Sequence, residues 1–317
     1  KGYEIKEGGR IWEIELRKIR WSNGDPVTAD DMLFFWNDEM LDPEVGGGSA
    51  FKQFTIGGVA AKLEKLSEHK VRFTFAEPRG DFLEILTYYN AISPSAFLRR
   101  YHPRYGDQAF LEAEMKRYNA PHPRALYNFV KVNNPELPVL SPWTYRQYTT
   151  MSPIIFVRNP YYFAVDEQGR QLPYIDRVQY ELLDAMMLPL AVANGRSDMQ
   201  FRYLRFENYT EFAARAKANG FHLRGWVPGT RSEWLLYPNL NRAVSETDAG
   251  SAFKAKLLYQ ADFRKALSLA IDRATAIRAV YSGMAKPWQV DPGPASEYSS
   301  EKLRHAYREW NDTKGAS

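Results

Sequence analysis

The side chains that most often carry chemistry are few and widely separated in this sequence of 317 residues. None of the five histidines has the spacing of a metal site such as HExxH, so we interpret each as a surface or packing residue. They are His69, His102, His122, His222 and His305. The sequence contains no cysteine, which excludes disulfides, thiolate nucleophiles and Cys-ligated zinc. It also contains no nucleophile elbow, phosphate-binding loop or dinucleotide fingerprint.

The carboxylates make no stronger case for catalysis. Asp30 and Asp31 follow Thr28 at the start of an expected helix, where capping explains them. Asp176 could act as a general base, but nothing in the sequence supplies it with a partner. We therefore expect no enzymatic activity, no catalytic residue, no cofactor and no metal site. An α+β hydrolase stays open as the alternative from a different functional class.

The composition is that of an ordinary globular chain, with 44% hydrophobic and 25% charged residues. The net charge is only +4, and the basic runs at Arg99-Arg100 and residues 202–205 are short, so we expect no nucleic-acid partner. Aromatic residues reach 15%, which first suggests a binding surface. We interpret most of them instead as core residues, among them six on strand or helix faces that are expected to pack: Trp12, Phe34, Phe35, Trp36, Phe73 and Phe75.

The elements that position these side chains begin with an α+β pattern. Residues 10–17 alternate between apolar and charged side chains, which predicts a half-buried strand, and residues 71–75 repeat the pattern. Between these strands, residues 21–26 predict a tight turn. Thr28 to Asp31 predicts a capping box that opens an apolar helix over residues 32–40. The glycines of residues 46–49 indicate a surface loop.

The second half of the chain starts after a Pro- and Asn-rich stretch, residues 118–142, that predicts a domain crossing. Further elements are predicted from periodicity and caps. They are strands at 154–158 and 178–183, a helix at 186–194, a helix capped by Asn208 and ended by Gly220, a short buried strand at 234–237, a helix with Phe263, Ala266, Leu267, Ala270 and Ile271 on one face, and a helix capped by Asp272 that stops at Gly283.

Four stretches together resemble the extracellular solute-binding proteins of family 5, the peptide/nickel-type receptors of ABC importers. The first two are IRWSNGDPVTADD at 19–31 and RNPYY at 158–162, the latter followed by GRQLPYIDRV at 169–178. The others are NGRSDM at 194–199 and FRKALSLAIDR at 263–273. Their turns and caps identify a scaffold rather than a ligand.

The resemblance implies an α/β fold with mixed α+β subdomains, a two-lobed periplasmic-binding-protein-like receptor of type II, present in part. It implies a small α+β subdomain at 1–141, the central part of the first lobe at 142–230, and a crossing strand with the start of the second lobe at 231–317. The sequence resembles an internal portion that lacks the family's N-terminal segment and much of its C-terminal lobe. We therefore expect this chain alone to bind ligand weakly or not at all.

By the same resemblance, the protein is expected to capture a peptide-like solute between two lobes and deliver it to an ABC permease, as a monomer when full length. An oligosaccharide ligand is the alternative within the family. The implied location is periplasmic, or extracellular as a membrane-anchored lipoprotein. The ligand-binding residues implied at the cleft are Trp234, Tyr237, Asn239, Asn241 and Trp288, although Pro238 removes a backbone donor beside them.

Overall fold

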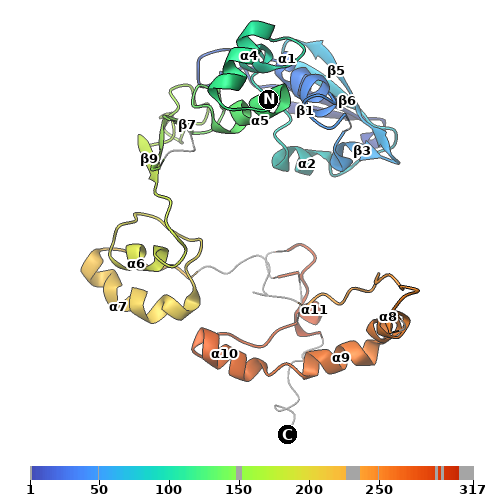
Figure 1. The fold of residues 1–317 in the computed structure, drawn as a ribbon, viewed down its shortest axis with the longest axis vertical. Coiled ribbons are helices and arrows are strands. Elements are labelled where there is room, and N and C mark those ends of the chain that lie inside the picture. Colours follow the sequence, from blue (N-terminus) through green and yellow to red (C-terminus); the bar gives the residue numbers. More distant parts are fainter. Residues whose placement is uncertain are drawn as a thin grey trace. The chain divides into compact units, whose positions relative to one another are not determined.

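The computed structural model describes residues 2–48, 50–147, 152–225, 236–248, 250–289, 292–293 and 296–306. The chain divides into two compact units, Lys1–Leu182 and Leu183–Ser317. Figure 1 shows that the first unit combines sheets with helices, whereas the second is mainly helical. The three-part division predicted from the sequence, with boundaries after residues 141 and 230, stays a prediction.

Unit 1 is built on a four-stranded antiparallel sheet. Its strands, in spatial order, are β1 (Gly2–Lys6), β2 (Ile11–Glu15), β6 (Lys70–Thr74) and β5 (Lys62–Ser67). Trp12 of β2 pairs in register with Phe73 of β6, and both side chains are buried. Since alternate side chains of a strand share a face, this register confirms the strands predicted around residues 10–17 and 71–75.

The predicted helix over residues 32–40 consists of two joined pieces. The α-helix α1 (Ala29–Leu33) continues as a π-helix, η2 (Phe34–Met40), in which the Leu41 N–H donates to the Trp36 carbonyl at 3.1 Å. Trp36 packs edge-on against Phe73 with ring centroids 5.5 Å apart. The helical segment thus contributes to the same apolar core as the sheet.

The capping box at the start of α1 is confirmed. The Asp31 carboxylate accepts a hydrogen bond from the Thr28 N–H at 3.1 Å, the reciprocal half of such a box. The remaining small elements near this core are η1 (Glu7–Gly9), η3 (Lys52–Phe54), the β3–β4 hairpin (Thr55–Ile56 and Val59–Ala60) and α2 (Phe82–Tyr88).

A second apolar cluster in unit 1 is formed mainly by helices. They are α3 (Ser95–Leu98), η4 (Arg99–Tyr101), α4 (Gln108–Arg117) and α5 (Pro123–Asn133). The interpretation of residues 118–142 as a domain crossing is wrong for α5, because Leu126, Tyr127 and Val130 are buried in this cluster. Pro123 occupies the first turn of α5, where a missing N–H and a fixed φ suit a helix start.

Unit 1 ends in a three-stranded antiparallel sheet in the order β7-β8-β9. Its strands are β7 (Trp143–Tyr145), β8 (Ile154–Arg158) and β9 (Arg177–Tyr180), which confirms the strands predicted near 154–158 and 178–183. Asn159, directly after β8, is buried and donates through Nδ2 to the Ser141 carbonyl at 3.0 Å. This bond ties the end of β8 to the segment that precedes β7.

Unit 2 contains the elements that follow residue 183. Its helices are α6 (Leu188–Ala193), η5 (Phe206–Asn208), α7 (Tyr209–Asn219), α8 (Ser251–Tyr259), α9 (Ala261–Leu269), α10 (Arg273–Tyr281) and α11 (Glu301–His305). Asp272 caps α10 as predicted, accepting from the Thr275 N–H at 2.9 Å. Gly220 ends α7 in the left-handed region, with φ of 72°, also as predicted.

Two local predictions in unit 2 are wrong. The Asn208 side chain does not cap α7, since the preceding turn η5 already brings the backbone into a helical path. Leu236 and Tyr237 belong to no strand and their side chains are 67% and 81% exposed, so the buried strand predicted at 234–237 is absent from its described half. Pro238, which lacks an N–H, follows directly and cannot donate to a ladder there.

The outer face of the main sheet carries a carboxylate that generates the first prediction. Glu13 is buried and contacts three cations: Lys6 at 2.9 Å, Lys70 at 2.7 Å and Arg72 at 2.6 Å. Hydrogen bonds from Lys70, Lys6 and Arg72 hold the pKa of Glu13 far below its usual value of 4.5. A carboxylate with a lowered folded-state pKa stabilises the fold above its unfolded pKa, and this stabilisation fades as the pH falls.

We therefore expect Glu13→Gln to be less stable than the parent chain at pH 7, with a difference that shrinks as the pH falls below about 4.5. Urea unfolding of both proteins, followed by circular dichroism at a series of pH values, measures this difference. Glu15→Gln on the same strand, at an exposed position, serves as the control. A Glu13→Gln deficit that stays constant between pH 7 and pH 3 would contradict the assignment.

Candidate functional site

The ligand-binding residues predicted from the sequence lie in unit 2. Trp234 falls outside the described residues. Tyr237, Asn239 and Asn241 are exposed in one irregular segment, where the Asn241 N–H donates to the Asn239 side-chain oxygen at 3.0 Å. Trp288 is half-buried and follows α10. The structure therefore places three of these residues next to one another along the chain, and their role in binding stays a prediction.

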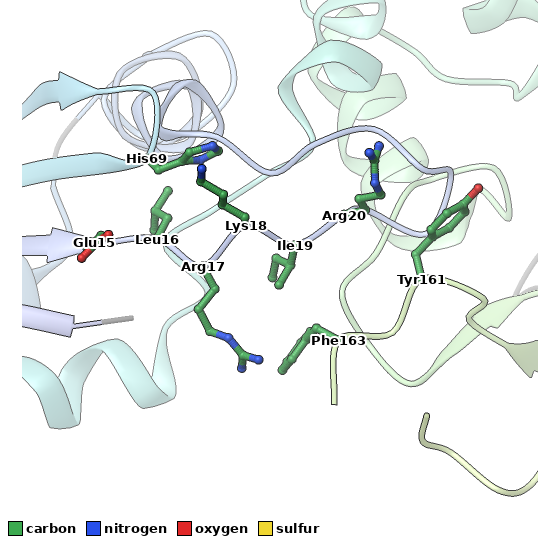
Figure 2. A pocket seen from close by; sticks show the side chains of 9 residues that line it. All are labelled: Glu15, Leu16, Arg17, Lys18, Ile19, Arg20, His69, Tyr161 and Phe163. Atoms are coloured by element: carbon green, nitrogen blue, oxygen red, sulfur yellow. The ribbon is translucent and has the colours of Figure 1, made fainter. Parts of the chain in front are cut away.

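Among the hollows of the described part of unit 1 are two of similar size. One, of about 590 Å³, lies along residues 15–20 beside Tyr161 and Phe163 (Figure 2). The other, of about 560 Å³, lies between η2, the glycine loop of residues 46–48 and α5. Both fall within the 300–1,000 Å³ that small-ligand sites commonly occupy. The second combines an apolar floor with a polar rim, so we take it as the candidate ligand site.

The floor of the candidate site is apolar and partly aromatic. Buried Phe35, Met40 and Val45 form it, and Phe51, which is 46% exposed, stands beside them. Such a surface favours flat or aliphatic ligand groups, because their burial removes apolar area from water.

The rim of the candidate site is rich in hydrogen-bond donors. Lys52, Arg124 and Asn128 are exposed there, and Lys131 lies deeper, with its ammonium 5.7 Å from the Phe35 ring centroid. Arg124 donates one of its bonds to the Gly46 carbonyl and so holds the glycine loop against α5. A guanidinium has five N–H donors, so Arg124 retains others for a ligand.

Beneath the rim, Glu39 joins η2 to α5. Its carboxylate accepts from the Tyr127 hydroxyl and, at 2.6 Å, from the Ser93 hydroxyl, and it pairs with Lys131 at 3.0 Å. Burial, together with the Glu39 charge, raises the pKa of the Tyr127 phenol well above its usual range. The phenol is therefore a fixed donor at neutral pH. Glu39 is committed to three partners and acts in positioning the site.

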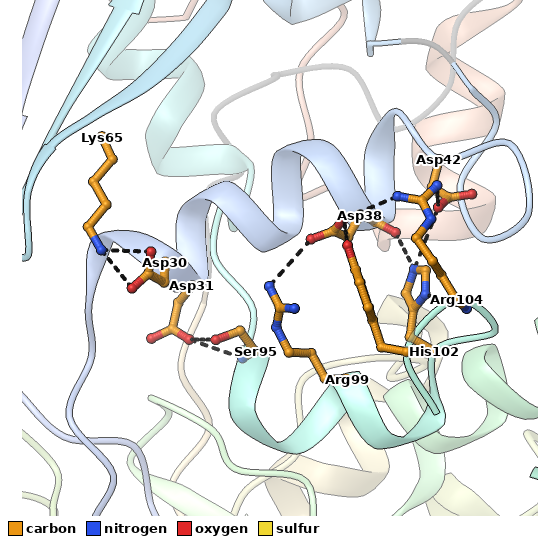
Figure 3. Close-up of polar contacts among 10 residues, drawn as sticks. Asp30, Asp31, Asp38, Asp42, Lys65, Ser95, Arg99, His102 and Arg104 are labelled. Carbon is orange, nitrogen blue, oxygen red and sulfur yellow. Dashed lines mark hydrogen bonds and ion pairs between the residues drawn. The ribbon is translucent and has the colours of Figure 1, made fainter. Parts of the chain in front are cut away.

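The helical segment that presents Phe35 and Glu39 is held by further buried carboxylates (Figure 3). Asp31 accepts from the Ser95 N–H at 3.0 Å and from its hydroxyl at 2.6 Å. Farther along, Asp42 is buried and pairs with Arg104. Asp38 accepts from the Tyr105 hydroxyl at 2.6 Å. Among the described residues, no group of three or more acidic, His or Cys side chains could hold a metal ion.

The glycine loop approaches η2 so closely that only glycine fits at one position. A Cβ on Gly46 would stand 1.9 Å from the Glu39 carbonyl oxygen and 2.7 Å from that of Met40. The sequence identified these glycines only as a surface loop, and nothing in a glycine run distinguishes a free loop from one pressed against a helix. The candidate site was therefore missed from the sequence.

Comparison with known proteins identifies the scaffold that holds these elements. The family model of the bacterial extracellular solute-binding proteins, family 5 (middle region) matches residues 1–316. The chain belongs to this family. Residues 1–316 make up nearly the whole chain, so the match includes both hollows and all five predicted ligand residues.

Relatives and solved structures agree with the family. The periplasmic alpha-galactoside-binding protein of Rhizobium meliloti (strain 1021) is 28% identical over 287 residues, which is 89% of this chain and 39% of that protein. The structure of the oligopeptide-binding protein OppA is similar with a TM-score of 0.77 and 31% identity, covering 96% of this chain and 48% of that one. A periplasmic binding protein from Agrobacterium fabrum C58, MelB in complex with stachyose, has a TM-score of 0.56 and 25% identity, covering 92% and 41%.

These matches confirm the resemblance read from the four motifs and the α/β, type II periplasmic-binding-protein fold. The chain spans half or less of the length of these relatives. Family and fold are those of solute-binding proteins. In the described part of the chain, no helix has both the length and the apolar character needed to cross a bilayer.

The close approach of Gly46 generates a prediction with a matched neighbour as its control. We expect Gly46→Ala to destabilise unit 1 by about 1–3 kcal/mol, since the added methyl group must push the loop away from η2. Gly47→Ala should change stability by less than about 0.5 kcal/mol, because nothing lies within 4 Å of its Cβ position. Chemical denaturation of the two variants, compared with the parent chain, measures the difference. Equal stabilities for the two variants would show that the loop is not pressed against η2.

Proposed function

We propose that this chain is part of the substrate-binding component of an ABC importer. The component captures a peptide-like solute between two lobes and hands it unchanged to a membrane permease. The observation that carries this proposal is the family match over residues 1–316, supported by the similarity to the oligopeptide-binding protein OppA at 31% identity. Dipeptide- and oligopeptide-binding proteins from Bacillus subtilis are further relatives of the chain.

An oligosaccharide is the second candidate ligand, and a specific observation favours it. The alpha-galactoside-binding relative matches 89% of this chain at 28% identity, and the structure with bound stachyose is 25% identical. Sugar rings stack on aromatic faces, and partly exposed aromatics such as Phe51 offer such a face. The donor-rich rim of the candidate site serves either class, because peptide carbonyls and sugar hydroxyls both accept hydrogen bonds.

In this proposal the candidate site of unit 1 supplies part of the ligand contacts. Phe51 provides apolar contact, and Lys52 and Asn128 provide donors. For unit 2, the proposed ligand-binding residues are those predicted from the sequence: Trp234, Tyr237, Asn239, Asn241 and Trp288. The protein acts without catalysis, since its task is to bind and release.

The remaining parts of the proposal follow from the family. The importer's membrane permease is the protein partner, and the full-length receptor acts as a monomer. It works in the periplasm, or outside the cell as a membrane-anchored lipoprotein. Each of these properties is a proposal that extends the family assignment.

The ligand class can be decided by ligand-observed NMR, which detects weak binding. We expect saturation transfer from this chain to a mixture of tri- to pentapeptides, and weaker or no transfer to stachyose. Phe51→Ser with Lys52→Gln should reduce the transfer at least about threefold, since both side chains line the site and are exposed.

Lys116→Gln, at an exposed position of α4, is the control and should leave the transfer unchanged. Transfer to stachyose in place of peptides would favour the sugar-binding function. Conversion of a peptide or sugar to product in the same samples would overturn the proposal in favour of a hydrolase.

A further inference from the structure

The hollow along residues 15–20 is a separate feature of unit 1 that the ligand site does not use. Its wall is the chain that leaves β2, with Tyr161 and Phe163 opposite (Figure 2). Arg17 extends beside Phe163, with its guanidinium 4.9 Å from the ring centroid. Lys18 and Arg20 extend to the other side of the segment. Arg17 thus extends to one side of this segment and Lys18 and Arg20 to the other, and the carboxylate Glu15 lies at its start. We call the hollow that these residues line the basic groove.

The three cations of the basic groove form no ion pair within the described residues, although the carboxylate Glu15 also lines the hollow. Arg17 and Lys18 are exposed and form no ion pair there, and Arg20 bonds only to a neutral carbonyl, that of Gly24, at 2.7 Å. Other cations of this unit differ: Lys65 pairs with Asp30 at 2.7 Å and Arg79 with Asp81 at 2.8 Å. A cluster of unpaired cations attracts anions.

The groove is formed before any partner arrives. The Leu16 N–H donates to the His69 carbonyl at 2.7 Å, which fixes the start of the segment against the turn between β5 and β6. At the other end, Tyr161 ring atoms lie 3.1 Å from the position of a Cβ on Gly24. The Tyr161 N–H in turn donates to the side-chain oxygen of buried Asn159 at 2.9 Å. Such preorganisation lowers the ordering entropy that binding costs.

One further atom of the groove lacks a partner. The Nδ1 of His69 is buried from solvent and has no hydrogen-bond partner among the described residues. Buried polar atoms are usually satisfied, so this unpaired nitrogen, beside Lys18 in Figure 2, is an exception in the lining of the groove.

We propose that the basic groove is a docking site for an extended acidic segment of a partner protein. Carboxylates of that segment would pair with Arg17, Lys18 and Arg20, and an apolar or aromatic side chain would pack on Tyr161 and Phe163. Charge complementarity carries the choice of an acidic partner. This proposal does not depend on the identity of the transported solute.

The shape of the groove favours a protein segment over a membrane. A membrane surface is flat and contacts protruding side chains, while the residues of the basic groove border a hollow of about 590 Å³. An extended chain fits a hollow that follows one segment of this unit, residues 15–20.

The test uses a fluorescein-labelled hexapeptide of Asp and Glu residues with one Phe at an interior position. Fluorescence anisotropy measures the binding of this peptide to the full chain. We expect saturable binding that weakens at least about tenfold when NaCl rises from about 0.05 to about 0.5 M, since the charges are exposed. Arg17→Gln with Lys18→Gln should weaken binding at least about tenfold. A peptide with Asn and Gln in place of the acids should not bind.

Two matched variants keep the result interpretable. Lys116→Gln with Arg117→Gln changes the net charge of unit 1 by the same amount on α4 and should leave the affinity within about twofold. Arg17→Lys with Lys18→Arg keeps both charges and should retain binding, which excludes misfolding as the cause of a loss. Equal weakening by the α4 control, or binding to vesicles of about 30% phosphatidylserine without binding to the acidic peptide, would overturn the proposal.

Discussion

The constraint on which the rest of unit 1 depends is the burial of the Asp31 carboxylate. Asp31 is 4% exposed and has no cation beside it among the described residues, so hydrogen bonds alone must offset its loss of water. It accepts from the Trp21 ring nitrogen at 3.0 Å, from the Thr28 N–H and from Ser95. These donors come from the Asn-Gly turn region, the helix start and α3. One carboxylate therefore fixes the position of three segments. If the helix that carries it rotated, the buried carboxylate would lose its hydrogen-bond donors, which is costly.

That fixed helix determines where the candidate site lies. Asp31 and Glu39 belong to one helical segment, α1 continued by η2, so the orientation that satisfies Asp31 also sets the direction of Glu39. Trp36, between them, is locked edge-on against Phe54 and Phe73 in the core. The π-helical turn leaves Glu39 facing α5, where Tyr127 and Lys131 meet it. The position of the floor of the site thus follows from core packing.

Local signals in the sequence predicted much of the scaffold. The Thr-Ala-Asp-Asp start of α1 and the Asp272 cap of α10 were predictable, because a cap depends on residues three positions apart. The Ser95 partner of Asp31 lies 64 residues away, and the contact of Gly46 with η2 involves a helix that precedes it. Hydrophobic periodicity in the sequence does not indicate such long-range contacts, so the candidate site was found only in the structure. The strand predicted around Tyr237 failed for the same reason, since a strand exists only with a partner.

The two hollows of unit 1 differ in what their cations already contact, and this difference separates their roles. In the candidate ligand site, the deepest cation, Lys131, is neutralised by Glu39, whereas Lys52 and Arg124 stay charged at the exposed rim. The apolar floor of that site therefore suits uncharged ligand groups. In the basic groove, Arg17 and Lys18 form no ion pair among the described residues, and their field extends into solvent. Long-range attraction of that kind speeds and orients encounters between proteins, whereas it adds nothing to the binding of an uncharged solute. Unit 1 therefore has a candidate ligand site with an apolar floor that acts through direct contact, and a basic groove that also attracts a charged partner over a longer distance.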